Sequence, residues 1–279
     1  MAAVTPTPPP SGAAATAPAR PPAPAAPAKP APPPPRPKVG ELRDVGTVLH
    51  ETVDAERWTS RGAVKVTGDV HIGHGDLEGT ATLGGTLEAD AVRSRGALDV
   101  EGSIEVRTTF VSAGTLHAGA TLHSGDGDLR GSSRVSGAVT VDRTLSVRGH
   151  LIAPSVAAGA LRLEGVGEVP GPITGTAVEL HLEADSEFGS VTARSVVVRG
   201  KVPNLVEKVL GRRVSVTVRR IEADTVDLVG VDVAFVRAPQ IRLGRDAHVT
   251  EYEGTIAYRH SSASVGFESK SPPPYGLRR

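Results

Sequence analysis

Glycines recur through the middle of this chain at an almost constant interval, and this repeat limits the folds that the sequence can adopt. The successive steps are 17, 17, 18 and 17 residues, between Gly62, Gly79, Gly96, Gly114 and Gly131. A second column follows six residues later, at Gly68, Gly85, Gly102 and Gly137, with Ala120 in the remaining place. Self-similarity at a fixed period of this length is typical of solenoids, in which each repeat stacks on the one before.

Apolar residues hold the same places in each repeat and alternate with polar ones, as in GAVKVTGDVHI (62–72) and GALDVEGSIEV (96–106). Alternation with period 2 indicates β-strands that bury one face. Counted from each glycine, the third, fifth, ninth and eleventh places are predicted to point inward. They hold Val64, Ala81, Leu98, Leu116 and Ser133; Val66, Leu83, Val100, Ala118 and Val135; Val70, Leu87, Ile104, Leu122 and Val139; and Ile72, Ala89, Val106, Ser124 and Val141.

The remaining six or seven residues of each repeat supply a third, less regular side. Its predicted inward residues are Leu77, Val92, Val111, Leu129 and Leu145. Three short strands in a coil of 17–18 residues is the geometry of a parallel β-helix, an all-β solenoid. Glycine suits the corners because it reaches positive φ at little steric cost, and valine suits a stacked, pleated surface.

The same pattern sets the expected domain boundaries. Starting at Val45, the inward places hold Thr47, Leu49, Val53 and Ala55, which predicts a first coil; a capping helix is the competing interpretation, since Val45, Leu49, Val53 and Trp58 also lie near helical spacing. Downstream the alternation continues to about residue 258, for roughly 12 coils. We therefore expect a tail at 1–40, a β-helix at 41–258 with a short helical insertion at 203–211, and a flexible tail at 259–279.

Residues 1–38 differ in composition from the repeats. They contain 15 prolines, no acidic residue and four basic residues, Arg20, Lys29, Arg36 and Lys38. Such a segment cannot bury a core, and we expect a disordered, polyproline-like tail. Its role is either that of a spacer or that of a weak attachment to an anionic membrane or an acidic partner.

A group of basic residues surrounds the insertion and is a candidate docking patch for an acidic client or lipid. It consists of Lys201, Lys208, Arg212, Arg213, Arg219 and Arg220, and Glu207 is the one acid among them before Glu222. The alternative interpretation is a solvated rim of the β-helix with no partner.

The sequence offers little for catalysis or cofactor binding. There is no cysteine, the nine histidines are scattered without a metal-ligand spacing, and phosphate-binding and nucleophile-elbow motifs are missing. The segments 73–76 and 125–128 lack the full calcium-binding nonapeptide pattern and are interpreted as turns. Hexapeptide acyltransferases need a strict six-residue repeat, which this chain lacks. We expect no enzyme activity, no metal and no cofactor, and the zero net charge argues against a nucleic-acid partner.

In its proline-rich tail followed by glycine-cornered coils such as GAVKVTGDVHI and GALDVEGSIEV, the chain resembles the bactofilins, the polymer-forming cytoskeletal proteins. The segment 220–256 resembles later coils of a longer, bactofilin-like subgroup. The resemblance implies a right-handed β-helix and a cytoplasmic scaffold that polymerises with itself end to end, without nucleotide, and holds client proteins or lies on the membrane. The chain departs from typical bactofilins in its length and in the insertion.

Open coil ends support self-assembly independently, because their unpaired strand groups need a partner. Leu49 and Val53, as inward residues of the expected first coil, are the candidate polymer interface. The alternatives are a β-helical binding or regulatory module that does not polymerise, and an acyltransferase.

Overall fold

The computed structural model describes residues 39–201 and 215–269. The chain divides into two units, residues 1–36 and 37–279, and every described residue belongs to the second. The described ranges contain thirteen β-strands and no helix. The strands are β1 (Val39–His50), β2 (Val53–Val66), β3 (Val70–Leu83), β4 (Leu87–Val100), β5 (Ile104–Ala118), β6 (Leu122–Val135), β7 (Val139–Ile152), β8 (Val156–Leu182), β9 (Ser186–Gly200), β10 (Val216–Val229), β11 (Asp232–Leu243), β12 (His248–Arg259) and β13 (Ser264–Glu268).

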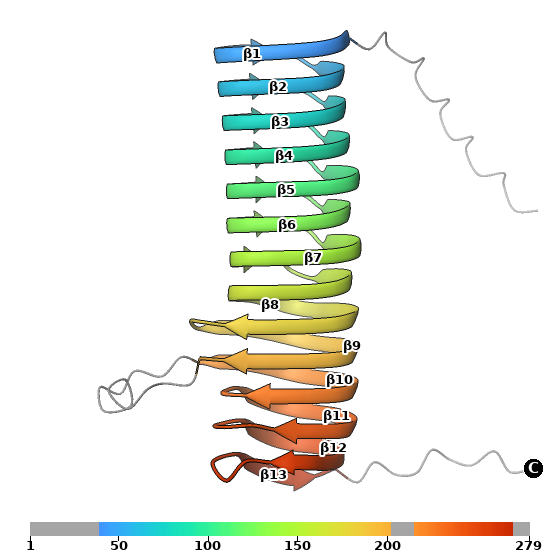
Figure 1. The fold of residues 1–279 in the computed structure, drawn as a ribbon, viewed down its shortest axis with the longest axis vertical. Helices are drawn as coiled ribbons and strands as arrows, with labels where there is room; N and C mark the ends of the chain where they lie inside the picture. The colour runs from blue at the N-terminus through green and yellow to red at the C-terminus, as the bar shows by residue number, and fades with distance from the viewer. Residues whose placement is uncertain (1–38, 202–214, 270–279) are drawn as a thin grey trace, which may run out of the picture. The chain divides into compact units, whose positions relative to one another are not determined.

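Each strand from β2 to β12 pairs in parallel with the strand before it and the strand after it in the chain, so the sheet order is β1 to β13 without a crossover. Figure 1 shows the consequence, a stack of coils in chain order. Residues one coil apart face each other and form columns that run along the stack, as in Val64, Ala81 and Leu98. The prediction of an all-β solenoid is confirmed.

The glycine column forms the corner at which each strand bends. Glycines from Gly62 to Gly165 in this column all have positive φ, between 102° and 130°. A β-carbon built on Gly96 would lie 2.1 Å from the carbonyl oxygen of Gly79, so the corners stack too closely for any side chain. Both the backbone conformation and the close approach therefore require glycine.

We expect Gly96→Ala to destabilise the fold by at least about 2 kcal/mol, because it combines backbone strain with a steric clash. Gly46→Ala is the matched control, since Gly46 also has positive φ but a β-carbon there would meet nothing within 4 Å. Chemical denaturation followed by circular dichroism gives both values. Equal losses for the two variants would show that stacking of the corners contributes nothing.

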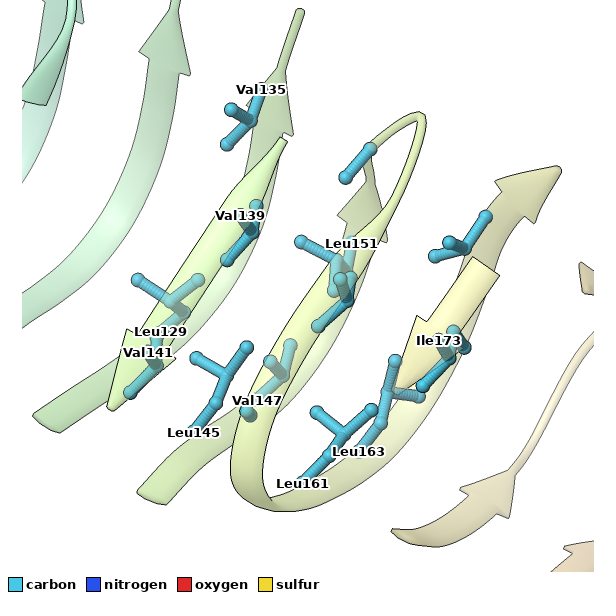
Figure 2. Close-up of a cluster of buried hydrophobic side chains, with 14 of the residues drawn as sticks. Leu129, Val135, Val139, Val141, Leu145, Val147, Leu151, Leu161, Leu163 and Ile173 are labelled. Carbon is cyan, nitrogen blue, oxygen red and sulfur yellow. The ribbon is translucent and has the colours of Figure 1, made fainter. Parts of the chain in front are cut away.

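The inward places predicted from the repeat are all buried, in every coil from Val64 to Val141. Figure 2 shows how leucine and valine side chains of successive coils meet inside the stack, among them Leu129, Leu145 and Leu161. One prediction on the third side is wrong. Val111 is only half-buried, and Phe110 takes the inward place and faces Val92. The 18-residue coil accommodates its extra residue in a bulge between Val106 and Thr109, which shifts the register beyond it.

The first coil is a strand, as predicted, but its register differs by one residue. Gly46 pairs with Gly62, so the corner is Gly46 and not Val45. Val48 and His50 consequently continue the inward columns of Val64 and Val66, whereas Leu49 points outward and is 69% exposed. The predicted inward orientation of Thr47 and Leu49 is wrong, because this coil is one residue shorter than the usual period.

The coils also extend further than predicted at the carboxyl end. β12 runs to Arg259, and β13 adds part of another coil up to Glu268, so residues 259–269 belong to the solenoid and not to a flexible tail. The stack has about 13 turns in place of the 12 expected. The predicted helical insertion at 203–211 and residues 1–38 of the predicted tail lie outside the described residues. The solenoid begins two residues earlier than predicted, because β1 starts at Val39, within the tail expected at 1–40.

Candidate functional site

The two ends of the coil stack are the places where the described fold is left incomplete. Among the described strands, β1 pairs only with β2 and β13 pairs only with β12. One side of each terminal strand therefore carries backbone N–H and C=O groups without a strand partner. Such edges serve as templates for pairing with another chain unless they are blocked.

Large hydrophobic side chains on the described surface are confined to these end coils. Four of them are exposed: Val45 and Leu49 in β1, Tyr258 in β12 and Phe267 in β13. The sides of the stack from β2 to β11 expose none within the described ranges. The exposed large hydrophobic residues of the described ranges therefore lie only at the two ends.

A polar cluster lies inside the first coil. Asp44 occupies an inward column above Ser60 and is only 8% exposed. Its Oδ2 accepts a hydrogen bond of 2.7 Å from Nε1 of the buried Trp58 and lies 2.9 Å from Nε2 of His50. The amino-terminal end of the core is thus closed by a carboxylate held by two ring nitrogens.

The carboxyl-terminal end carries a cation in place of the carboxylate. Arg259 donates two hydrogen bonds, from Nε and Nη2, to the carbonyl oxygen of Ala263, at 3.2 and 3.1 Å. Tyr252, Ile256 and Val265 are partly buried and pack against the last layer of the core. The two ends therefore differ in one respect: the first coil buries an acid, Asp44, whereas β12 ends in an exposed base, Arg259.

The two residues predicted as a polymer interface lie at the amino-terminal end but face different ways. Val53 is buried, as predicted, and continues into the column of Val70. Leu49 lies on the outer surface next to Lys65. Their role in an interface stays a prediction.

The predicted docking patch is only partly described, because Lys208, Arg212 and Arg213 lie outside the described residues. Lys201 is exposed at the end of β9. Arg219 pairs with Glu187 at 2.8 Å. Arg220 pairs with Glu222, and its guanidinium lies 4.8 Å from the ring centre of Phe235. The described arginines of the patch thus hold acidic partners within the solenoid, which favours the solvated rim for them.

Pairing of opposite charges from coil to coil is general on the sides of the stack. Glu78 lies between Arg61 and Arg95 of the neighbouring coils, at 3.4 and 2.9 Å. The hydrogen bond from the Arg143 guanidinium lowers the pKa of Asp126 below its usual value. Because these charges compensate each other locally, the described sides do not form a surface of one sign.

The described residues contain no cluster of three or more His, Cys, Asp or Glu side chains that could hold a metal ion. In the same ranges, no helix is long and apolar enough to cross a membrane. Comparisons of this chain with protein-family models, with curated proteins and with solved structures found no match.

Sequence reasoning missed the polar residues at both ends. Gly46, sixteen residues before Gly62, was the signal that would have placed Asp44 and His50 inside the first coil. Arg259 was missed because the alternation fades beyond residue 258. Residues 264–268 are too few to show a period by themselves.

Proposed function

We propose that the protein is a structural scaffold that assembles with itself, through the ends of its solenoid, into filaments that need no nucleotide. This is the role that the resemblance to bactofilins implies. The observation that carries the proposal is the confinement of exposed large hydrophobic side chains to the end coils, at Val45, Leu49, Tyr258 and Phe267.

Backbone pairing and apolar burial supply the driving force. A second copy stacked on an end would give hydrogen-bond partners to one whole coil and cover the partly buried Tyr252, Ile256 and Val265. In a solenoid each coil contacts only its neighbours, so each added coil contributes a similar stacking free energy. Stacking between two copies therefore resembles the stacking of coils within one copy. Repeated end-to-end stacking of copies does not form a closed ring, and it therefore builds filaments.

In such a filament the sides of the stack, with their ion pairs between coils, would form the exterior, where client proteins or a membrane surface would attach. Residues 1–38 and the basic residues around 203–211 are the segments proposed for that attachment.

Wild-type full-length protein should form filaments in negative-stain electron micrographs, and sedimentation should show assembly that increases with protein concentration. Filaments should persist with EDTA and without ATP or GTP, and moderate salt should change them little, because apolar burial is insensitive to screening. Phe267→Ser should weaken assembly, whereas Thr140→Ser, on an exposed mid-stack side, should not. A protein that stays monomeric at every concentration would contradict the proposal.

One observation favours the second candidate, a β-solenoid binding module that does not polymerise. The inward carboxylate of Asp44 is the kind of device that blocks edge-to-edge association, because an approaching apolar coil would bury it. The sedimentation experiment separates the two candidates directly.

A further inference from the structure

The last described coil stops, and the first described coil starts, at nearly the same position around the solenoid. β13 pairs with β12 only as far as Glu268 on Tyr252, so Gly254 to Arg259 have no strand partner among the described residues on the side away from β11. β1 begins at Val39 in the column of Ala55, two places beyond the column of Val53 and Tyr252 in which β13 stops. A second copy placed beyond β13 can therefore continue the spiral without a rotational offset.

The column of Leu49 shows this continuity residue by residue. Its first member lies in β1 and its last, Ser264, lies in β13. The column runs through Leu49, Lys65, Thr82, Asp99, His117, Arg134, Ile152, Glu168, Glu187, Thr217, Asp232, His248 and Ser264. In a stack of copies that keeps its columns, Leu49 of one copy would follow Ser264 of another.

The same continuation brings the charged residues of the two ends together. The column of Asp44 runs through Leu77 and Leu129 to Leu163. The bond from the Glu183 N–H to the Gly165 carbonyl sets the step inside β8, so that Leu180 follows Leu163. From Leu180 the column continues through Val198, Leu228 and Leu243 to Arg259. The first residue of this column, Asp44, is therefore an acid, and the last, Arg259, is a base.

We propose that copies of this chain join head to tail, with the β1 end of one copy on the β13 end of the next, so that the filament is polar. The inference rests on the proposed self-assembly and adds the identity of the two surfaces that meet. At each joint Asp44 lies about 4.8 Å along the stack from Arg259 of the neighbouring copy, the spacing of adjacent strands. Asp44 already bonds to Trp58 and His50, and the guanidinium would add a cationic partner when the joint removes the remaining water.

Joining like ends would not provide this compensation. A joint between two β1 ends would bury two Asp44 carboxylates, with His50 and Trp58 as their partners and no arginine in their column. A joint between two β13 ends would bring two Arg259 guanidinium groups together. Glu268 is the one end group that the head-to-tail joint does not match, because it continues the column of Tyr252; its exposed side chain must turn outward there.

Cysteine cross-linking tests the direction, because the natural chain contains no cysteine. Two full-length single variants, Leu49→Cys and Ser264→Cys, are oxidised separately and as a mixture. Neighbouring parallel strands bring Cα atoms within the range of a disulfide, about 4.4–6.8 Å. We expect a covalent dimer in the mixture and none in either variant alone. Lys65→Cys mixed with Ser264→Cys is the matched control, since Lys65 lies one coil further from the joint and should not cross-link.

The outcomes separate this inference from the proposed function. Filaments whose mixed variants fail to cross-link, or whose single variants cross-link with themselves, overturn head-to-tail assembly and leave self-assembly standing. A wild-type protein that never assembles overturns both.

Charge reversal at Arg259 provides an independent test of the same joint. Arg259→Asp should raise the critical concentration for assembly at least about tenfold, because it sets two carboxylates against each other. Arg259→Lys should restore most of the assembly, and Arg134→Asp, an exposed mid-stack reversal, should have little effect. Trp58, the only tryptophan, reports on the joint by fluorescence through its bond to Asp44. Assembly of Arg259→Asp that equals the wild type would overturn the pairing.

Discussion

Val139→Asp is expected to reduce the free energy of unfolding by about 3–5 kcal/mol. Val139 is fully buried and lies between Leu122 and Val156 of the adjacent coils. Figure 2 shows it in the interior beside Val141 and Val135. An aspartate there has no cationic partner and no water, so its carboxyl group loses solvation without compensation. Urea denaturation followed by circular dichroism measures the loss.

Thr140→Asp is the matched control for this substitution. Thr140 is the next residue of β7, is exposed, and stands beside His123 of the preceding coil. The same carboxylate placed there stays in water, and we expect a change within about 0.5 kcal/mol. Similar losses for the two variants would mean that β7 does not alternate between core and solvent.

The central coils could be predicted from sequence because two independent patterns fix the same register. The glycine at each corner and the alternation after it agree from Gly62 to Val141, and a shift of one residue would expose every buried valine. Where the period changed, the prediction failed locally. Phe110 displaced Val111 from the core because one extra residue entered that coil.

The end coils could not be predicted as well, for a physical reason. A terminal coil has a neighbour on one side only, so its sequence need not satisfy the alternation on which the prediction depended. Asp44 and His50 stand in places that hold Ser60 and Val66 one coil later. Polar residues in inward columns look like breaks in the repeat, although here they close the core.

The residues that specify the fold and those that form the candidate site are thus recognised in the sequence by different features. Apolar residues that repeat specify the stack. Buried serines such as Ser94 and Ser112 are tolerated within the inward columns, whereas the charged residues of the Asp44 column stand at its two ends. Asp44 breaks the column at one end and Arg259 at the other. These two charged departures from the pattern are the ones on which the head-to-tail proposal rests.

Trp58→Ala is expected to be the most disruptive change at the amino-terminal end, with a loss of about 3–5 kcal/mol. Trp58 is fully buried and holds the Oδ2 atom of Asp44 at 2.7 Å. Removing it creates a large cavity under Leu42 and takes away one of the two ring nitrogens that hold the carboxylate. Because coils contact only their neighbours, the damage should begin in β1 and leave distant coils folded. Hydrogen exchange measured along the chain would show early exchange in β1 and β2.

Two further variants divide this loss into packing and hydrogen bonding. Trp58→Phe keeps most of the aromatic volume but removes the indole N–H, so Asp44 retains only His50 as a partner. We expect Trp58→Phe to be less costly than Trp58→Ala, and Asp44→Leu to recover part of the loss, because an apolar residue needs no donor. If Trp58→Phe is as stable as the wild type and Asp44→Leu adds nothing to it, the hydrogen bond does not stabilise the first coil, and only the packing of the indole ring does.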